Sequence, residues 1–169
     1  DAMHPTQATK VSGGWIKTGH DKTIKTTGSR TRLNIVGAID LKDISSAIVH
    51  RYDKVNSSTM QDFFAAIRQQ YPIDTAIHLI LDGAGYHRAK DLKERAVELN
   101  IKLHYLPPYS PNLNPIERLW KVMNEHVRNN QYFSTAKEFR EQIDDFFVNT
   151  LPEIGDDVEL HLKVIHFTP

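Results

Sequence analysis

Residues 77–85 read Ile77-His78-Leu79-Ile80-Leu81-Asp82-Gly83-Ala84-Gly85, an apolar run that ends in an acidic residue and a glycine-rich turn. A continuous apolar run of this length is typical of a strand that is buried on both faces. Ligand sites in open α/β sheets lie at the carboxyl ends of strands, and Asp82 occupies that position. Alternatively, the Asp82 side chain caps the following turn through an Asx hydrogen bond, and both interpretations remain open here.

A second acidic residue, Glu117, follows a proline-rich segment and is separated from Asp82 by 34 residues. Four of the eight prolines fall within residues 107–115, so this segment should be stiff and should fix where the next helix begins. With Asn114 as N-cap and Pro115 at the first helical position, Glu117 fits a capping box. It could instead present its carboxylate to a functional site, but the spacing alone favours the capping box.

The rest of the chain predicts strands that alternate with helices. Strands are predicted over residues 33–39, 47–51 and 101–106, with a short one over residues 13–17. Helices are predicted from an N-cap at Ser58 to the Tyr71-Pro72 pair, and over residues 89–99, 115–127 and 135–148. Residues 17–30 should form an exposed hairpin or loop, and residues 158–167 a strand or a short helix. This alternation indicates an α/β fold with a partly parallel sheet.

Length and composition place limits on the kind of protein. A chain of 169 residues predicts one domain, residues 1–169. The absence of cysteine excludes disulfides and cysteine-ligated metal sites, and it fits a reducing cytoplasm. No apolar run approaches the ~20 residues of a membrane helix, and no signal peptide is visible. The chain begins with Asp1 in place of Met, so we expect an upstream segment.

The net charge is zero, which argues against a generic nucleic-acid binder, but the charges are unevenly distributed. Six basic residues stand against one acidic residue between positions 10 and 32, whereas acidic residues dominate beyond position 135. This asymmetry predicts one face for a polyanion, although a solvated surface with uneven charge explains it equally well. The six basic residues are Lys10, Lys17, Lys22, Lys25, Arg30 and Arg32.

Two carboxylates are usually too few for a two-metal phosphoryl-transfer site, so a third acidic residue is expected. Asp1, Asp40 and Asp53 are the candidates, and Asp40 is the first choice because it ends the predicted strand over residues 33–39. His87 could orient a phosphate or a water molecule, although a packed or surface histidine is the more common case. His4 carries the same two interpretations. The sequence contains no zinc-binding histidine spacing, Walker A motif, hydrolase elbow or dinucleotide-binding glycine motif.

The proline-rich segment Leu106-Pro107-Pro108-Tyr109-Ser110-Pro111-Asn112-Leu113-Asn114-Pro115-Ile116-Glu117-Arg118-Leu119-Trp120 resembles the hallmark of DDE transposases of the mariner superfamily, in particular its bacterial insertion-sequence branch. Ile80 to His87 resembles the second-carboxylate motif of that family, with the usual 34-residue spacing to the glutamate. Asp1-Ala2-Met3-His4-Pro5 resembles the first-carboxylate motif. The segments Gly13-Gly14-Trp15 and Asn34 to Ala38 resemble those that follow it.

This resemblance implies a ribonuclease H-like mixed sheet flanked by helices. It makes Asp1, Asp82 and Glu117 the catalytic and metal-binding triad, which moves the third carboxylate from Asp40 to Asp1. Two Mg²⁺ or Mn²⁺ ions would support cleavage and strand transfer of DNA in cut-and-paste transposition. Arg118, Lys121, His87 and the six basic residues would contact the DNA. A homodimer on transposon ends and a bacterial cytoplasmic, nucleoid-associated location are implied.

Two departures from the family pattern bear on activity. Gly83 stands where the family commonly has asparagine, and residues 1–169 do not include the N-terminal helix-turn-helix region that the family usually carries. The strand that leads into Asp1, which should be central to the fold, is also expected to be truncated. Two alternatives therefore stay open: a domesticated or degenerate relative that binds DNA without cutting it, and another ribonuclease H-like nuclease.

Overall fold

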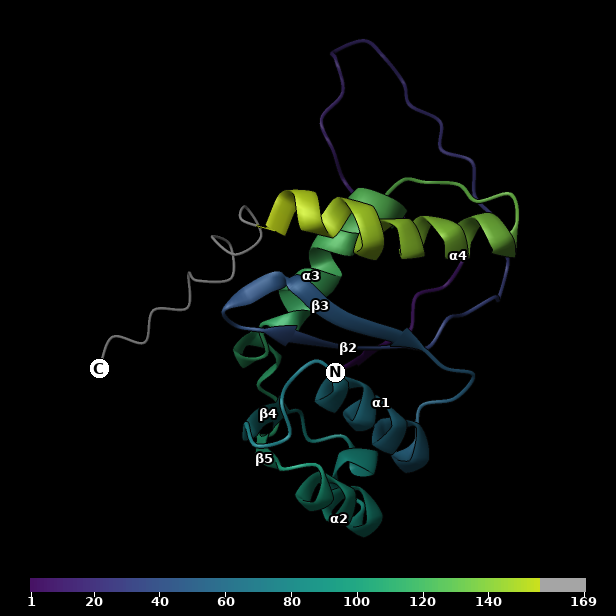
Figure 1. Ribbon diagram of the computed structural model, residues 1–169. Coiled ribbons are helices and arrows are strands. Elements are labelled where there is room, and N and C mark those ends of the chain that lie inside the picture. Colours follow the sequence, from purple (N-terminus) through teal and green to yellow (C-terminus); the bar gives the residue numbers. More distant parts are fainter. Residues whose placement is uncertain (156–169) are drawn as a thin grey trace.

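Two small β-sheets with helices against them form the part of the chain that the computed structural model describes, residues 1–155 (Figure 1). The strands are β1 (Ala2–Met3), β2 (Ile35–Asp40), β3 (Asp43–Arg51), β4 (Ile77–Leu81) and β5 (Ile101–Tyr105). The α-helices are α1 (Ser57–Gln69), α2 (Lys90–Glu98), α3 (Ile116–Met123) and α4 (Ala136–Asp145). Short 3₁₀ turns cover Gly85–Arg88 and Pro111–Leu113, and π-helical turns follow α3 and α4 at Asn124–Arg128 and Phe146–Thr150. The predicted element over residues 158–167 lies outside the described residues.

The strands pair in two ladders. β1, β2 and β3 are antiparallel, whereas β4 and β5 are parallel and joined through α2. Among the described residues no ladder joins β2 to β4, and a cavity of about 510 Å³ with mainly apolar walls lies between them. The predicted α/β class is observed, but the hydrogen bonding does not form the single mixed sheet that was expected. The two-residue β1 pairs with β2 and does not extend alongside β4.

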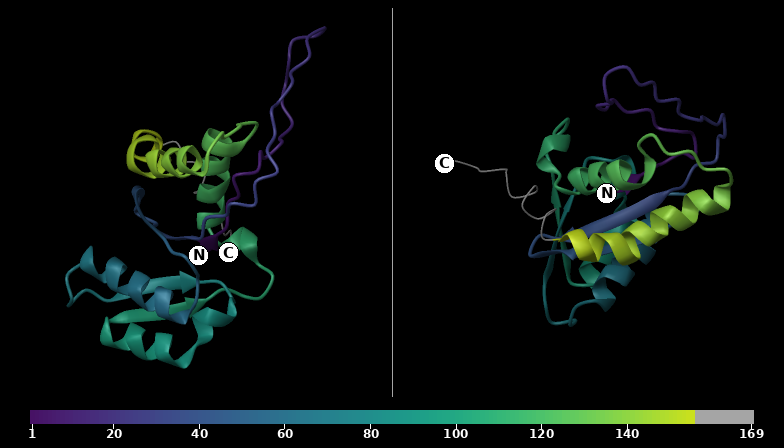
Figure 2. Two further views of the ribbon diagram at one scale, coloured as in Figure 1. Left: turned by 90° about the vertical axis from the view of Figure 1, so that its right-hand side faces the viewer. Right: turned by 90° about the horizontal axis from the view of Figure 1, so that it is seen from above.

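β2 separates two hydrophobic cores. Ile35 faces the core formed with α3 and α4, and Val36 faces the core formed with α1 and α2. Both side chains are fully buried. Successive side chains of a strand point to opposite faces of its sheet, so adjacent residues of β2 serve different cores. The two further views show helices on both sides of this sheet (Figure 2). The fold is therefore layered, with helices outside and strands between.

β4 differs from its prediction in burial. Leu81 is buried, but the side chain of Ile80 is 47% exposed and His78 is exposed as well. His78 stacks on His104 of β5, with ring centroids 5.0 Å apart. The prediction of a strand buried on both faces is therefore wrong, because the two-stranded sheet is covered on one face only.

α1 begins earlier than predicted. Asn56 is its N-cap: its side chain accepts a hydrogen bond from the Thr59 backbone N–H, and the Thr59 hydroxyl accepts one from the Asn56 N–H. This reciprocal pair is a capping box, with threonine in the place of the usual glutamate or glutamine. Ser58, the predicted N-cap, lies inside the first turn, so that prediction is wrong.

α3 begins at Ile116 without a side-chain cap. Asn114 accepts a hydrogen bond from the Glu117 N–H through its backbone oxygen, at 3.1 Å, so the predicted capping box does not form. The helix also ends sooner than predicted. In the π-helical turn that follows, the buried Arg128 donates to the Asn124 side chain and to the backbone oxygen of Thr6.

Residues 11–31, here called the arm, project from the body of the molecule (Figures 1 and 2). Isolated bridges between Lys10 and Asn129 and between Thr6 and Arg32 mark its base. The predicted strand over residues 13–17 is wrong, because these residues lie in the extended arm without a strand partner among the described residues, and Trp15 is fully exposed. The predicted exposed loop over residues 17–30 is confirmed.

Candidate active site

Asp82 follows the last residue of β4, as the sequence predicts. Its Oδ1 accepts two hydrogen bonds, one from the Ala84 backbone N–H at 3.1 Å and one involving Nδ1 of His87 at 2.7 Å. The first bond is the Asx turn that was the alternative interpretation of Asp82. Both bonds use the same oxygen, so Oδ2 has no hydrogen-bond partner among the described residues.

His87 lies next to Asp82, and its side chain is fully buried. Its Nε2 has no hydrogen-bond partner among the described residues. Burial lowers the pKa of His87, while the charge of Asp82 acts in the opposite direction. A neutral ring with the proton on Nδ1 fits this setting, because a charged ring would leave a buried N–H unpaired.

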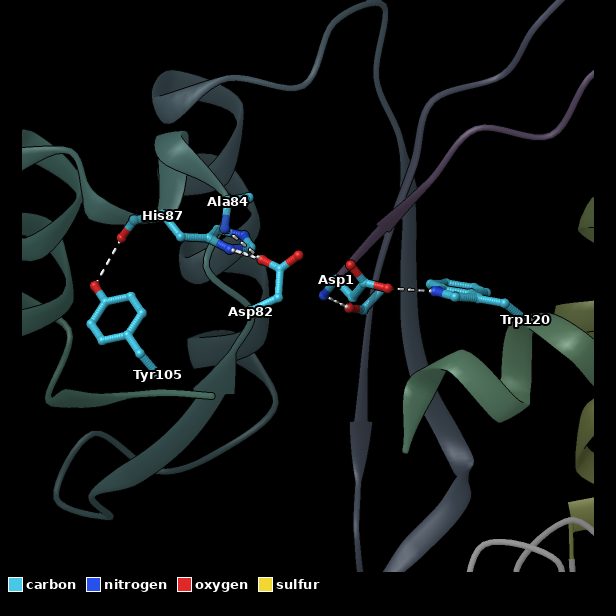
Figure 3. A network of polar contacts seen from close by, with 7 residues as sticks. Asp1, Asp82, Ala84, His87, Tyr105 and Trp120 are labelled. Carbon is cyan, nitrogen blue, oxygen red and sulfur yellow. Dashed lines mark hydrogen bonds and ion pairs between the residues drawn. The ribbon is translucent and has the colours of Figure 1, made fainter. Parts of the chain in front are cut away.

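Two tyrosines support His87. The Tyr105 hydroxyl donates to the His87 backbone oxygen at 2.8 Å, and the Tyr86 ring contacts the imidazole edge to face, with centroids 4.5 Å apart. The expected contact between His87 and DNA does not fit this arrangement, because the buried ring offers no surface to a phosphate. The structure brings His87 to Asp82 instead (Figure 3).

Asp1 lies beside Asp82 and is held by Trp120 on its other side (Figure 3). The Trp120 indole N–H donates to Oδ2 of Asp1 at 3.0 Å. The backbone of Asp1 continues the β1 ladder, since its nitrogen donates to Gly37 and its oxygen accepts from Gly37, both at 2.9 Å. One oxygen of the Asp1 carboxylate is therefore occupied, and the other has no hydrogen-bond partner among the described residues.

Glu117 lies in the first turn of α3, with an exposed side chain. Trp120, three residues further along the same helix, donates a hydrogen bond to Asp1 and so connects this helix to residue 1. Within residues 1–155, however, no three acidic or histidine side chains converge closely enough to hold a metal ion.

The other candidate acidic residues have local roles. Asp40 ends β2, where it accepts hydrogen bonds from the Lys42 N–H at 2.9 Å and the Tyr71 hydroxyl at 3.0 Å. Asp40 therefore lies at the strand end and in the following turn, which is the place that the resemblance implied. Asp53 follows β3 in the loop to α1. His4 forms a hydrogen bond with the side chain of Asn34.

The predicted DNA-contacting basic residues are exposed, with one intermediate case. Lys121 pairs with Glu125 at 3.9 Å across the surface of the helix, and Arg118 is partly exposed. Arg32 donates to the side chain of Asn34. The six residues at or beside the arm are all exposed, namely Lys10, Lys17, Lys22, Lys25, Arg30 and Arg32.

Sequence reasoning missed Trp120 and Gly37 as parts of the site. The sequence pattern assigned Trp120 only to the apolar stripe of its helix. It follows Glu117 by three residues, however, and therefore lies on the same side of the helix. A Cβ atom on Gly37 would lie 2.5 Å from Cη2 of Trp120, so glycine is required for the indole to approach β2. A glycine inside a strand was the available signal of such a close approach.

Comparison with known proteins places these residues in a family context. A sequence profile described as DDE superfamily endonuclease matches residues 1–140. An uncharacterised protein, y4pE/y4sA of Sinorhizobium fredii (strain NBRC 101917 / NGR234), is 40% identical over 80 residues, which is 46% of this chain and 56% of that protein. The uncharacterised 39 kDa protein of insertion element IS630 from Shigella sonnei is 23% identical over 150 residues, 86% of this chain and 43% of that protein. The chain thus spans about half the length of these relatives.

Solved structures of Mos1 mariner transposase share the fold. Its paired-end complex with Mn gives a TM-score of 0.69 at 17% identity, covering 96% of this chain and 51% of that chain. Its catalytic domain alone gives a TM-score of 0.57 at 17% identity, covering 84% of this chain and 79% of that chain. These likenesses confirm the ribonuclease H-like α/β class predicted from the sequence.

Proposed function

Since the chain belongs to the family of DDE superfamily endonucleases, we propose that it is the catalytic domain of a transposase that cleaves DNA strands and transfers them in cut-and-paste transposition. The observation that carries this proposal is the pairing of Asp1 and Asp82, each held through one oxygen and each with its other oxygen available. Because β2 serves both cores, we further propose that residues 1–169 form one domain.

Asp1, Asp82 and Glu117 would hold two Mg²⁺ or Mn²⁺ ions. Carboxylate oxygens are the hard ligands that these ions prefer, and the two available oxygens lie on neighbouring side chains. The exposed Glu117 stands on a helix whose start follows the proline-rich segment. When bound, divalent ions supply positive charge at the reacting phosphodiester and lower the pKa of a water nucleophile. Solved Mos1 complexes with Mn and with Mg support this choice of ions.

DNA is the proposed substrate and partner, both as transposon ends and as target. The exposed basic residues of the arm, with Arg118 and Lys121 on α3, would neutralise its phosphates. The paired-end complexes of Mos1 support a homodimer on DNA. The insertion-element relative is bacterial, which supports action on DNA in the bacterial cytoplasm.

A test of the triad compares acidic residues in the intact protein. Asp1→Asn, Asp82→Asn and Glu117→Gln should each reduce Mg²⁺-dependent nicking of DNA by more than about 100-fold. Replacing a metal ligand should reduce activity more than replacing a residue that only hydrogen-bonds to a ligand. Asp40→Asn is the matched control, since Asp40 bonds only to a turn and to Tyr71. Nicking that survives Glu117→Gln, or is lost in Asp40→Asn, would show that the triad is assigned incorrectly.

A relative that binds DNA without cutting it is the second candidate. The observation in its favour is that no three potential ligands converge within residues 1–155. Calorimetric titration with Mn²⁺ separates the two: a protein that binds DNA but takes up no Mn²⁺ in its presence is the non-catalytic relative.

A further inference from the structure

We propose that Trp120 is a positioning residue for the Asp1 carboxylate. Its indole N–H holds Oδ2 of Asp1 and leaves the other oxygen to the cation. This inference rests on the proposed function, in which Asp1 is a metal ligand.

The hydrogen bond is specific in its geometry and in its chemistry. Nε1 of Trp120 lies 3.0 Å from Oδ2 of Asp1, and the Trp120 side chain is only 3% exposed. An indole offers one donor and no acceptor, so its single N–H is committed to this carboxylate. Bonds to an ionised acceptor are roughly twice as strong as neutral ones. A half-buried carboxylate that would otherwise turn freely is therefore fixed in one orientation.

The indole itself is held in place by its neighbours. Its Cη2 and Cζ2 atoms lie over Gly37, at 2.5 and 3.0 Å from where a Cβ would stand. The Phe147 ring packs against it edge to face, with centroids 6.0 Å apart. Because the ring has so little room, the direction of its N–H is set by packing on β2. Gly37 thus fixes Asp1 twice, through the backbone ladder and through the position of the indole.

Trp120 also connects Asp1 to the helix that carries Glu117. The two residues are three apart on α3, the spacing at which side chains are neighbours on a helix surface. The hydrogen bond spans 119 residues of sequence and joins the start of β1 to this helix. The same indole therefore orients one carboxylate and ties it to the helix that presents another.

Packing alone could explain a buried tryptophan, since such residues usually find a partner for their N–H. Replacement by 3-benzothienylalanine separates the two roles, because sulfur takes the place of N–H while the bicyclic shape is kept. Trp120→Phe is a second variant that keeps an aromatic ring. Trp15→Phe is the matched control, as Trp15 is the other tryptophan and is fully exposed in the arm.

Calorimetric Mn²⁺ titration of the intact protein is the first measurement. Both Trp120 variants should bind Mn²⁺ about 10- to 100-fold more weakly, the range typical of outer-shell partners, while Trp15→Phe binds as the parent does. Parent-like Mn²⁺ affinity in the benzothienyl variant, with binding abolished in Asp82→Asn, overturns the role of Trp120 and leaves the metal site intact. Parent-like binding in Asp82→Asn and Asp1→Asn instead overturns the proposed function.

Nuclear magnetic resonance of the parent fold gives a second measurement that does not depend on the Trp120 variants folding. The protein has two indole N–H signals, one for each tryptophan. Added Mg²⁺ should shift the Trp120 signal and leave that of Trp15 in place, and Asp1→Asn should move the Trp120 signal in the absence of metal. A Trp120 signal that ignores both Mg²⁺ and Asp1→Asn excludes the hydrogen bond as a positioning contact.

Discussion

The imidazole of His87 is the most completely enclosed polar side chain beside the candidate site. Its Nδ1 lies 2.7 Å from Asp82, while Nε2 has no partner among the described residues. Because the ring is fully buried, water does not compete for its Nδ1–H, which is committed to the Asp82 carboxylate. This hydrogen bond fixes the direction of that carboxylate.

Two substitutions of His87 should therefore differ in their effect on Mn²⁺ affinity. His87→Leu removes the donor and should weaken Mn²⁺ binding by about 10- to 100-fold, whereas His87→Asn retains an N–H near the position of Nδ1 and should recover part of that loss. Calorimetric titration with Mn²⁺ measures both, and thermal unfolding checks that each variant is folded. Equal affinities in the two variants would mean that the hydrogen bond is irrelevant to metal binding.

Individual residues were predictable from the sequence where a local pattern marks them. Asp82 was placed correctly at the end of its strand, since an apolar run followed by Asp and Gly is a local signal. The partnership of Asp82 with His87 is also local, but burial decides whether such a histidine faces solvent or the carboxylate. The contact between Trp120 and Asp1 crosses 119 residues, and no local pattern reveals it.

Helix starts illustrate the same limit for the secondary-structure elements. Asn114, Pro115 and Glu117 match the sequence pattern of a capping box, yet α3 starts without a side-chain cap. α1 starts with a reciprocal cap at Asn56 that a search for a glutamate or glutamine partner overlooks. The periodicity of apolar residues located the four α-helices of residues 1–155, because burial of one face is a property of the whole segment.

The contribution of the α1 N-cap to the free energy of unfolding should be measurable. Asn56→Ala removes the acceptor for the Thr59 N–H and should lower the free energy of unfolding by about 1 kcal/mol, within the usual range for N-caps. Ser58→Ala, at the position that the sequence favours, should change it by less than about 0.5 kcal/mol. Urea denaturation of both variants is the measurement. A larger loss for Ser58→Ala than for Asn56→Ala would place the cap at Ser58.

At the scale of the whole molecule, the arm and α2 differ in their balance of charge. The arm projects at one end, and α2 lies at the other (Figure 2). Exposed lysines occur in both places, but the arm between residues 11 and 31 holds a single acidic residue, Asp21. On α2, Lys90 pairs with Glu94 at 3.6 Å and Arg95 pairs with Glu98 at 2.8 Å. The arm therefore presents a larger excess of positive charge than α2 does.

Neutralising the arm should change how salt affects DNA binding. In the triple variant Lys17→Gln, Lys22→Gln and Lys25→Gln, the slope of log affinity against log salt should fall by about 0.9 for each lysine that contacts a phosphate. The control removes the same charge near α2, through Lys90→Gln, Lys93→Gln and Lys102→Gln. Fluorescence anisotropy with labelled duplex DNA at several salt concentrations gives both slopes. Indistinguishable slopes for the two triple variants would exclude the arm as a DNA contact.

The arrangement of strands was the least predictable property at this scale. Alternating strands and helices correctly indicated an α/β fold, and the order of elements agrees with it. The division into two ladders could not be foreseen. No local sequence pattern shows whether β2 and β4 pair directly or are separated by a cavity, as they are here. Ile80 shows the consequence for burial: an apolar side chain expected inside the sheet is 47% exposed.

The position of β2 between two cores has a consequence for the order of folding. The core on the Val36 side is completed mainly by residues 57–105, a continuous piece of chain with short loops. The core on the Ile35 side joins the N-terminal strands to α3 and α4, and contacts such as Gln7 to Phe133 close a loop of more than 100 residues. Short loops close at a smaller entropic cost, so the first core should form early and the second late. The carboxylate at position 1 and its tryptophan partner would then meet in the last step, which makes the candidate site a reporter of completed folding.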